Sequence, residues 1–180
     1  IVAIIFDAKV IHSERIYPIT DLFKKTIKPK FINSKFVNGN SFINSILIGD
    51  WPYFPAIIWR TTILKKYKFS KEYKSAMDLD LFLRFKNKDF KFIYNNKKII
   101  QYRRHENSAS SVQAKETTRF EEEYKIHSKF LSSNNSLYSN LLAKLSLSIR
   151  LHVLFITFKN IFETKADLKN YLKLLFRIIK

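Results

Sequence analysis

The sequence predicts an α/β fold followed by C-terminal helices. Three observations lead to this prediction: the chain opens with a β-branched apolar run, a helical pattern in the middle is followed by strand patterns, and the last third has helical periodicity. With 180 residues and 46% hydrophobic content, the chain is long enough to bury one sizeable core. We therefore expect a mixed sheet with flanking helices in residues 1–112 and a helical extension in residues 113–180.

Composition narrows the classes of function. The net charge of +18, from 33 basic and 15 acidic side chains, predicts an anionic partner such as nucleic acid, acidic lipid or a nucleotide diphosphate. Cysteine is absent, which excludes disulfides, thiolate metal sites and a cysteine nucleophile, and makes the cytoplasm the expected compartment. With only two glycines, the chain cannot contain a glycine-rich phosphate loop.

The first part of the chain has extended patterns. Residues 1–6 predict a buried strand that ends at Asp7, and residues 9–19 predict a second extended piece broken at Pro18. Helical spacing then begins at residue 21 and is stopped by Pro29, and Asn-Gly-Asn at residues 38–40 indicates a turn. Two prolines predict a shaped loop over residues 49–55, followed by a short apolar element over residues 56–59.

The second part begins with a helical pattern. Apolar spacing after Asp78 predicts a helix, for which Asp78 or Asp80 is a good N-cap. Residues 90–95 and 98–104 predict two strands joined by a polar turn at residues 95–98. Residues 114–132 predict a charged surface helix, and residues 136–163 a long amphipathic one.

The last segment, residues 167–180, places apolar side chains on one face of a helix and basic side chains on the other. Such a helix either lies on an anionic membrane surface or packs on the domain with a solvated basic face. No uncharged stretch in the predicted C-terminal helices is longer than that of residues 151–158, which is much shorter than the about 20 apolar residues that a bilayer span requires.

Asp78 and Asp80 are the first candidates for chemistry. A carboxylate at a helix N-terminus faces the positive end of the helix dipole, so its ionised form is favoured by about 0.3–1 kcal/mol and it can act as a base. Ordinary helix capping is the alternative role. Because the two residues are two positions apart, they lie on different sides of a helix and do not form a facing acid/base pair.

The segment that follows the second predicted strand carries candidate anion ligands. Arg103 and Arg104 suit a diphosphate, because forked guanidinium donors can clamp phosphate oxygens. His105 could bind a divalent metal ion or a phosphate, and all three residues have an ordinary surface role as the alternative. We assign no role to the other histidines, which have no acidic or histidine cluster around them: His12, His127 and His152.

The loop over residues 49–55 offers aromatic rings. Trp51, Tyr53 and Phe54 suit a sugar ring, which has one apolar face and many hydroxyl groups. The alternative is that these rings close the core under the loop, and we favour it for Phe54 at least.

The order of these segments resembles the second half of the catalytic domain of family 2 glycosyltransferases. These are inverting enzymes of GT-A fold, common in bacterial cell-surface polysaccharide synthesis such as that of lipopolysaccharide or capsule. The resemblance covers residues 49–111, and residues 1–13 more weakly, and it rests on the order of the shaped loop, "MDLD", an apolar helix, a strand pair and "YRRHENSAS". It implies a partial GT-A, Rossmann-like mixed sheet and a hexosyltransferase-type enzyme that uses a nucleotide-diphosphate sugar.

Residue by residue, the resemblance implies that Asp78 is the general base that removes the proton of the acceptor hydroxyl. Asp80 matches the second acidic position, which implies support of either the acceptor site or the helix start. With the aromatic rings of Trp51 and Tyr53, it makes up the expected acceptor-binding set. The donor diphosphate is expected at the basic segment formed by Arg103, Arg104 and His105. A Mg²⁺ or Mn²⁺ ion is expected with it, for which His105 is a candidate ligand and most of the other ligands belong to the family's N-terminal half.

The sequence also departs from the family pattern. Met77 stands where the family usually has a glutamate, and Thr61 leaves Arg60 as one basic residue where two are usual. The family's nucleotide segments do not occur, and Asp7 lacks the second carboxylate of a D-x-D motif. We therefore expect a C-terminal piece of a longer enzyme that is inactive by itself.

The expected partners follow from the same resemblance and from the charge. They are a nucleotide-sugar donor, a saccharide or lipid-linked acceptor and an anionic membrane surface, with no specific nucleic acid. The expected location is cytoplasmic, peripheral on the inner face of the plasma membrane. A function of another class is the alternative: a non-enzymatic basic module that binds nucleic acid or an anionic membrane.

Overall fold

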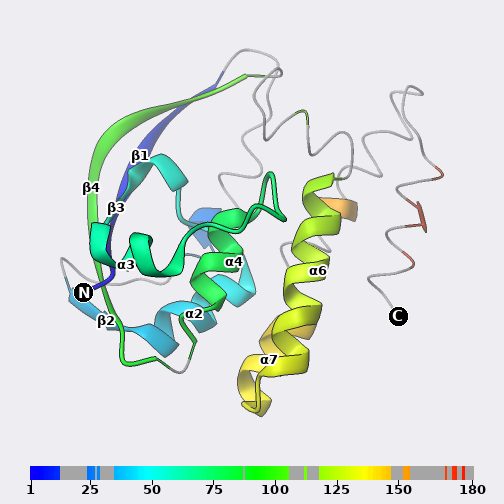
Figure 1. The fold of residues 1–180 in the computed structure, drawn as a ribbon. Coiled ribbons are helices and arrows are strands. Elements are labelled where there is room, and N and C mark those ends of the chain that lie inside the picture. Colours follow the sequence, from blue (N-terminus) through cyan, green and yellow to red (C-terminus); the bar gives the residue numbers. More distant parts are fainter. Residues whose placement is uncertain are drawn as a thin grey trace.

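The computed structural model describes residues 1–12, 24–26, 28, 35–86, 88–105, 112, 118–146, 152–154, 169, 172–173 and 176. These residues form a four-stranded mixed sheet and a set of helices (Figure 1). The α/β class predicted from the sequence is therefore confirmed. The strands and helices are, in chain order, β1 Ala3–His12, β2 Lys35–Asn38, α2 Gly39–Ile48, the 3-10 helix η1 Phe54–Ala56, β3 Ile57–Trp59, α3 Thr61–Tyr67, α4 Met77–Leu83, β4 Lys91–Arg104, α6 Thr118–Ser133 and α7 Leu137–Leu145.

The sheet has the strand order β2-β4-β1-β3. The two central strands, β1 and β4, are parallel, and each edge strand is antiparallel to its neighbour. Paired residues share a face of a sheet, so the register defines two rows across the strands. One row is largely buried under the helices and consists of Val37, Phe92, Ala3 and Trp59. The other row consists of Phe36, Ile93, Ile4 and Ile58, of which Phe36 and Ile58 are exposed.

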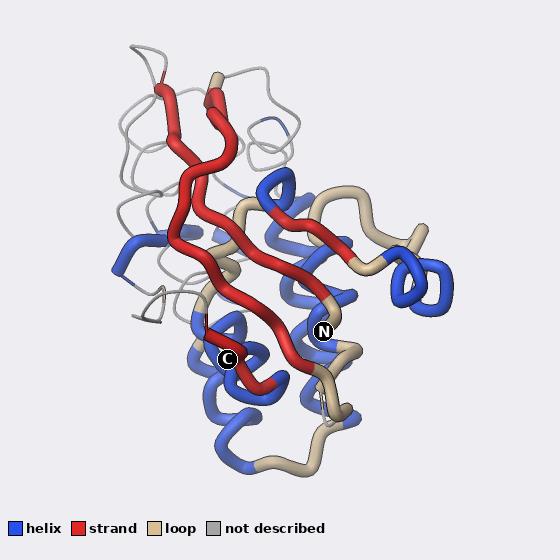
Figure 2. Tube along the Cα trace, turned by 90° about the vertical axis from the view of Figure 1, so that its left-hand side faces the viewer, coloured by secondary structure: helices blue, strands red, loops and turns tan. Residues whose placement is uncertain are grey.

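The helices lie on one side of the sheet, as the two views show together (Figures 1 and 2). Helices α2 and α4 pack directly on the strands, and α6 and α7 pack against α2 and α4. The centre of the core is aromatic: the Phe42 ring of α2 stacks on Phe92 of β4 with ring centroids 4.1 Å apart, and it meets Phe82 of α4 edge-on at 5.1 Å. This core holds the start of α4 against the sheet.

Strand β4 corrects two predictions. The two strands predicted over residues 90–95 and 98–104 are one strand, and the predicted polar turn between them is wrong. The pairing with β1 shifts there, because Phe6 pairs with Asn95 and Asp7 with Lys98, so that extra residues of β4 bulge out of the ladder. Strand β1 does not end at Asp7 as predicted, because its pairing with β4 continues beyond the bulge as far as His12.

The predicted turn at residues 38–40 is instead the start of a helix that the sequence analysis missed. Asn38 is the N-cap of α2, and its side-chain oxygen accepts a hydrogen bond from the backbone N–H of Asn40 at 2.9 Å. Gly39 lies so close to the chain before β4 that a Cβ atom on it would be 2.7 Å from the Phe90 carbonyl oxygen. The same carbonyl accepts the Gly39 N–H at 2.9 Å, so this close approach fixes how α2 leaves β2.

The N-cap predicted for α4 is wrong. Its N-cap is Ala76, and both Asp78 and Asp80 lie within the first turn. The chain before the helix is instead held by Glu122 of α6, whose carboxylate accepts three backbone N–H groups at 2.8–3.0 Å: those of Lys74, Ser75 and Ala76. Helix α6 was predicted to be a charged surface helix, but Glu122 and Glu123 are buried against this part of the fold.

Helix α7 begins as predicted but ends at Leu145, so the expected helix over residues 136–163 is interrupted there. Residues 152–154 are helical again. The helix predicted over residues 167–180 lies outside the described residues apart from four isolated positions, as does most of the extended piece predicted over residues 9–19. None of the helices in the described part of the chain is both long and apolar enough to cross a membrane.

Candidate functional site

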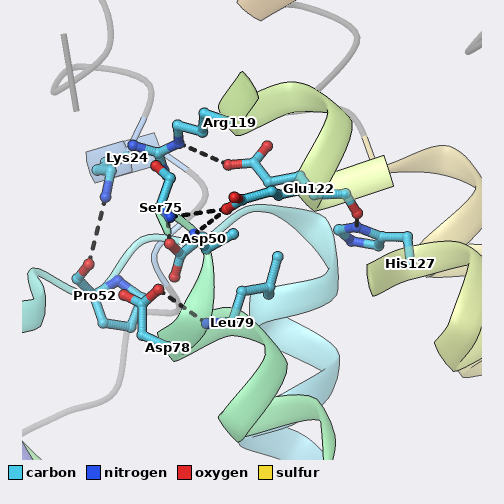
Figure 3. A network of polar contacts seen from close by, with 11 residues as sticks. Lys24, Asp50, Pro52, Ser75, Asp78, Leu79, Arg119, Glu122 and His127 are labelled. Carbon is cyan, nitrogen blue, oxygen red and sulfur yellow. Dashed lines mark hydrogen bonds and ion pairs between the residues drawn. The ribbon is translucent and has the colours of Figure 1, made fainter. Parts of the chain in front are cut away.

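Charged side chains from separate parts of the chain meet where the start of α4 faces the loop after α2 and the first turns of α6 (Figure 3). We call this group the Asp50–Asp78 cluster. It consists of three acids and two bases that interact electrostatically: Asp50, Asp78, Glu123, Lys24 and Arg119. The cluster is largely enclosed by protein, so its charges act on one another with little screening by water.

Asp78 is placed by the first turn of α4. It is buried, and its Oδ1 accepts a hydrogen bond from the backbone N–H of Leu79 at 3.0 Å. Burial raises the pKa of the Asp78 carboxyl above its ordinary value, while the positive charge of Arg119 and the backbone hydrogen bond oppose this rise. The result is a carboxylate that binds a proton more strongly than an exposed aspartate does.

Asp50 lies in the loop that leaves α2 at Gly49, the C-cap of that helix. Its Oδ2 is 3.8 Å from Nη2 of Arg119. Its Oδ1 is buried and has no hydrogen-bond partner within the described ranges. Burial raises the pKa of the Asp50 carboxyl to about 7, and the charge of Asp78 raises it as well, whereas Lys24 and Arg119 oppose the change.

Arg119 joins α6 to the two aspartates. Its Nε donates to Oε1 of Glu123, one turn further along α6, at 2.8 Å. Burial alone would lower the pKa of the Arg119 guanidinium, but Glu123 and Asp50 hold it above its usual value. Arg119 therefore stays charged and is shared between one close carboxylate and one more distant one.

Lys24 is the second base of the cluster. Its Nζ donates to the carbonyl oxygen of Pro52 at 3.4 Å and lies 4.9 Å from the centre of the Tyr53 ring. Burial lowers the pKa of the Lys24 ammonium, and the charge of Asp50 opposes this. Lys24 thus connects the acids to the aromatic loop.

The structure brings Tyr53 and Arg104, two of the residues predicted from the sequence, to the edge of this cluster. The Tyr53 ring lies 5.4 Å from the Tyr102 ring of β4, and the Arg104 guanidinium lies 5.5 Å from the Tyr102 ring centre. The positive charge of Arg104 also repels that of Lys24 and lowers the pKa of its ammonium group. Two tyrosine rings and Arg104 are therefore linked to the cluster through Lys24.

The structure does not bring Trp51 or Asp80 to the cluster. Trp51 is only 2% exposed, its Nε1 donates to Oγ of Ser45 at 3.1 Å, and its ring packs edge-on against core rings. Asp80 forms an ion pair with Arg84, one turn further along α4, at 2.9 Å. Both side chains thus have structural partners. Phe54, for which we favoured a core position, is instead 43% exposed.

The remaining predicted ligands, Arg103 and His105, are exposed at the end of β4. Arg103 alternates along the strand with the half-buried Tyr102 and Arg104, so it points to the other face of the sheet. Within the ranges that the structure describes, no three His, Asp or Glu side chains converge as ligands for a metal ion.

Sequence reasoning missed several members of this site. Asp50 lies inside the predicted aromatic loop of residues 49–55, and the four-residue spacing of Arg119 and Glu123 is typical of an ion pair on a helix, so both had a local signal in the sequence. Two histidines to which we assigned no role are also near Glu123. His127 Nδ1 donates to the Glu123 carbonyl at 2.8 Å, and burial, aided by Arg119, lowers the pKa of His152 to about 4.

Comparisons of this chain with protein-family models, with curated proteins and with solved structures found no match. The functional argument therefore depends on the chain's own residues and geometry.

Proposed function

We propose that this chain is the acceptor-side part of an inverting glycosyltransferase of family 2 and GT-A fold. The observation that carries the proposal is the position of Asp78. It is a buried carboxylate in the first turn of a helix and interacts electrostatically with Arg119 and Lys24, and Lys24 in turn lies 4.9 Å from the centre of the Tyr53 ring, which suits a sugar. The motif order described above supports the same assignment of Asp78.

A general base in such a reaction has to be ionised and yet bind a proton well. The raised pKa of Asp78 gives it a higher proton affinity than an exposed aspartate has, and Arg119 favours its charged form. In the proposed step, a hydroxyl group of the acceptor gives its proton to Asp78 while its oxygen bonds to the anomeric carbon of the donor. The bond between that carbon and the diphosphate oxygen breaks, and the nucleoside diphosphate leaves with the electron pair.

The leaving diphosphate needs positive charge near it. Lys24 lies against the Tyr53 ring and Arg104 against the Tyr102 ring, and we propose these two cations as contacts of the diphosphate, with Arg103 and His105 as outer ones. Mg²⁺ or Mn²⁺ belongs to the proposal through the family resemblance. The described residues supply no set of ligands for such an ion, and the step above does not pass through it.

Tyr53 is the proposed acceptor contact. Its ring is half-buried, with Nζ of Lys24 4.9 Å and the Tyr102 ring 5.4 Å from its centre, and an aromatic ring of this kind suits the apolar face of a sugar. Trp51 and Asp80, which the resemblance also implied, are held in the core and in an ion pair, so we do not retain them in the proposed acceptor site.

The test is sugar transfer by the protein expressed from the full reading frame that encodes this chain. A panel of nucleotide-diphosphate sugars and saccharide acceptors is screened for acceptor-dependent release of the nucleoside diphosphate. Asp78→Asn should abolish release while nucleotide-sugar binding is unchanged, and Asp89→Asn, which removes an exposed carboxylate, should have no effect. Transfer by the Asp78→Asn protein at the wild-type rate would remove Asp78 from the role of base.

Helix α7 favours a second proposal, which concerns location: association with an anionic membrane surface. One face of this short helix exposes four large apolar side chains, Leu137, Tyr138, Leu141 and Leu145, to between 51% and 87%. Three lysines are exposed on α6 and α7: Lys125, Lys129 and Lys144. Glu121 is the one exposed acid on these two helices. Apolar area together with positive charge matches a leaflet of acidic lipids rather than a second copy of a chain whose charge is +18.

Flotation with lipid vesicles tests this location. The chain should bind vesicles that contain phosphatidylglycerol and not vesicles of phosphatidylcholine alone. The double variant Leu137→Ser/Leu141→Ser should bind roughly tenfold more weakly, because each leucine loses apolar burial. Ile58→Ser is the matched control, since Ile58 and Leu141 are both 54% exposed but Ile58 lies on the sheet. Equal losses in the two variants would contradict the assignment to α7.

A further inference from the structure

The charges of the Asp50–Asp78 cluster do not balance. Three carboxyl groups, those of Asp50, Asp78 and Glu123, face two cations, and the closest contact of Arg119 is with Glu123 at 2.8 Å. Only a longer contact of 3.8 Å reaches Asp50. Two enclosed carboxylates that share one partly engaged cation repel each other, and such a pair keeps one proton more easily than it loses both.

The hydrogen bonds distinguish the two aspartates. Asp78 lies in the first turn of α4, where the helix dipole favours a negative charge, and its Oδ1 accepts a backbone N–H. Asp50 follows the C-terminal end of α2, where the dipole disfavours a negative charge, and its buried Oδ1 has no partner within the described ranges. An unpartnered buried oxygen costs far more in a carboxylate than in a neutral carboxyl group.

We propose that Asp50 is a positioning residue for Asp78: Asp50 holds the proton of the pair near neutral pH, so that the charge of Arg119 serves Asp78. The raised pKa of Asp50, about 7, agrees with this assignment. When the surroundings of two neighbouring carboxyl groups push their pKa values apart, the group with the lower pKa is charged and the group with the higher pKa is neutral between the two values. Only the role of Asp78 as a base rests on the proposed function; the shared proton does not.

Met77 immediately precedes Asp78 in the sequence. The family resemblance leads us to expect an acidic residue next to the base, and the chain has Met77 there. In the structure, Asp50 brings a carboxyl group to the base from the loop after α2 instead. Above pH 7 Asp50 ionises, places a second negative charge beside Asp78 and competes for Arg119.

Within the described ranges, the other charged groups around Asp50 come from several segments of the chain. They are Asp78 on α4, Arg119 and Glu123 on α6, and Lys24. Beyond them, Arg104 on β4 interacts with Lys24, and His152 interacts with Arg119 and Glu123. The two cations that face Asp50 directly both favour its ionised form, whereas burial and the charges of Asp78 and Glu123 favour the protonated form. Removal of the Asp78 charge should therefore lower the pKa of Asp50.

The test is a titration of the 180-residue chain with ¹³C-labelled aspartate, in which the side-chain carboxyl resonances are followed by NMR. One resonance should titrate near pH 7, and it should be missing from the spectrum of Asp50→Asn. In Asp78→Asn its midpoint should fall by about one pH unit or more. Asp89→Asn, the matched control that removes an exposed carboxylate, should leave the midpoint in place.

The wild-type titration alone can overturn the proposal, whatever the variants do to folding. If every aspartate titrates below about pH 6, no aspartate holds a proton near neutrality and the proposal is wrong. A resonance near pH 7 that does not move in Asp78→Asn would also contradict the pair. These readouts do not depend on catalysis, so loss of the proposed function and loss of the proton-sharing pair are separate outcomes.

Discussion

Glu122 offers the sharpest test of how α6 positions the site. Its carboxylate accepts three backbone N–H groups from the chain before α4: Oε1 accepts that of Lys74 at 2.9 Å, and Oε2 accepts those of Ser75 and Ala76 at 2.8 and 3.0 Å. Asp78 follows this segment by two residues. Substitution of Glu122 should therefore reduce stability and loosen the start of α4 together.

The magnitude follows from the two oxygens. In Glu122→Gln, the amide oxygen can replace Oε2 and keep two of the hydrogen bonds, but the amide nitrogen then faces the N–H of Lys74. A hydrogen bond to a charged group contributes about 1.5–3 kcal/mol, so the loss of one bond and of the charge should cost about 2 kcal/mol. Glu122→Ala loses all three bonds and should cost about 4 kcal/mol.

Urea denaturation measures these costs, with tryptophan fluorescence as the signal because Trp51 is in the core. Glu121→Gln is the matched control, since Glu121 is the exposed neighbour on the same helix and its substitution should change the free energy of unfolding by less than about 0.5 kcal/mol. Hydrogen exchange of the Ala76 amide should be faster in Glu122→Gln than in wild type. Equal stability of the two glutamine variants, with an unchanged Ala76 amide, would refute the role of Glu122.

Two further predictions concern stability. Because the pKa of His152 falls to about 4 in the folded chain, its contribution is present above pH 6.5 and is lost as the pH falls towards 4, by about 1–3 kcal/mol. His152→Phe keeps the ring contact with Phe120, so urea denaturation at pH 7 and at pH 4.5 should show a smaller difference than in wild type, and an equal difference would contradict the shift. Gly39→Ala should cost about 1–3 kcal/mol, because its Cβ would meet the Phe90 carbonyl oxygen at 2.7 Å. Gly49→Ala, at an extended φ of 179°, should cost clearly less in the same assay, and an equal cost would argue against the close approach at Gly39.

The parts of the fold predicted from the sequence are those with strong local patterns. The apolar spacing after Asp78 predicts α4 because a buried helix face repeats along the chain, and the prolines around residues 52–55 predict the loop and the short strand β3 after it. Tyr53 and Arg104 are candidate site residues from the sequence, but their common contact with the Tyr102 ring depends on the path of β4 and not on a local pattern.

The parts that sequence reasoning missed depend on partners distant in the chain. The bulge in β4 arises from its register with β1, and the polar residues there look like a turn when β4 is read alone. The N-cap of α4 was misassigned because the group that holds the chain before it comes from Glu122, 47 residues after Ser75. Trp51 and Phe54 exchanged their expected places because only the packing against Phe42 decides which ring turns inward.

The central claim is that Asp78 accepts the proton of an acceptor hydroxyl during sugar transfer. The most direct measurement is the rate of acceptor-dependent transfer by wild type and by Asp78→Asn, both expressed from the full reading frame, alongside binding of the nucleotide sugar. The account predicts that Asp78→Asn binds the donor as wild type does and transfers at least about 100-fold more slowly. Transfer at an undiminished rate by a folded Asp78→Asn protein would contradict it.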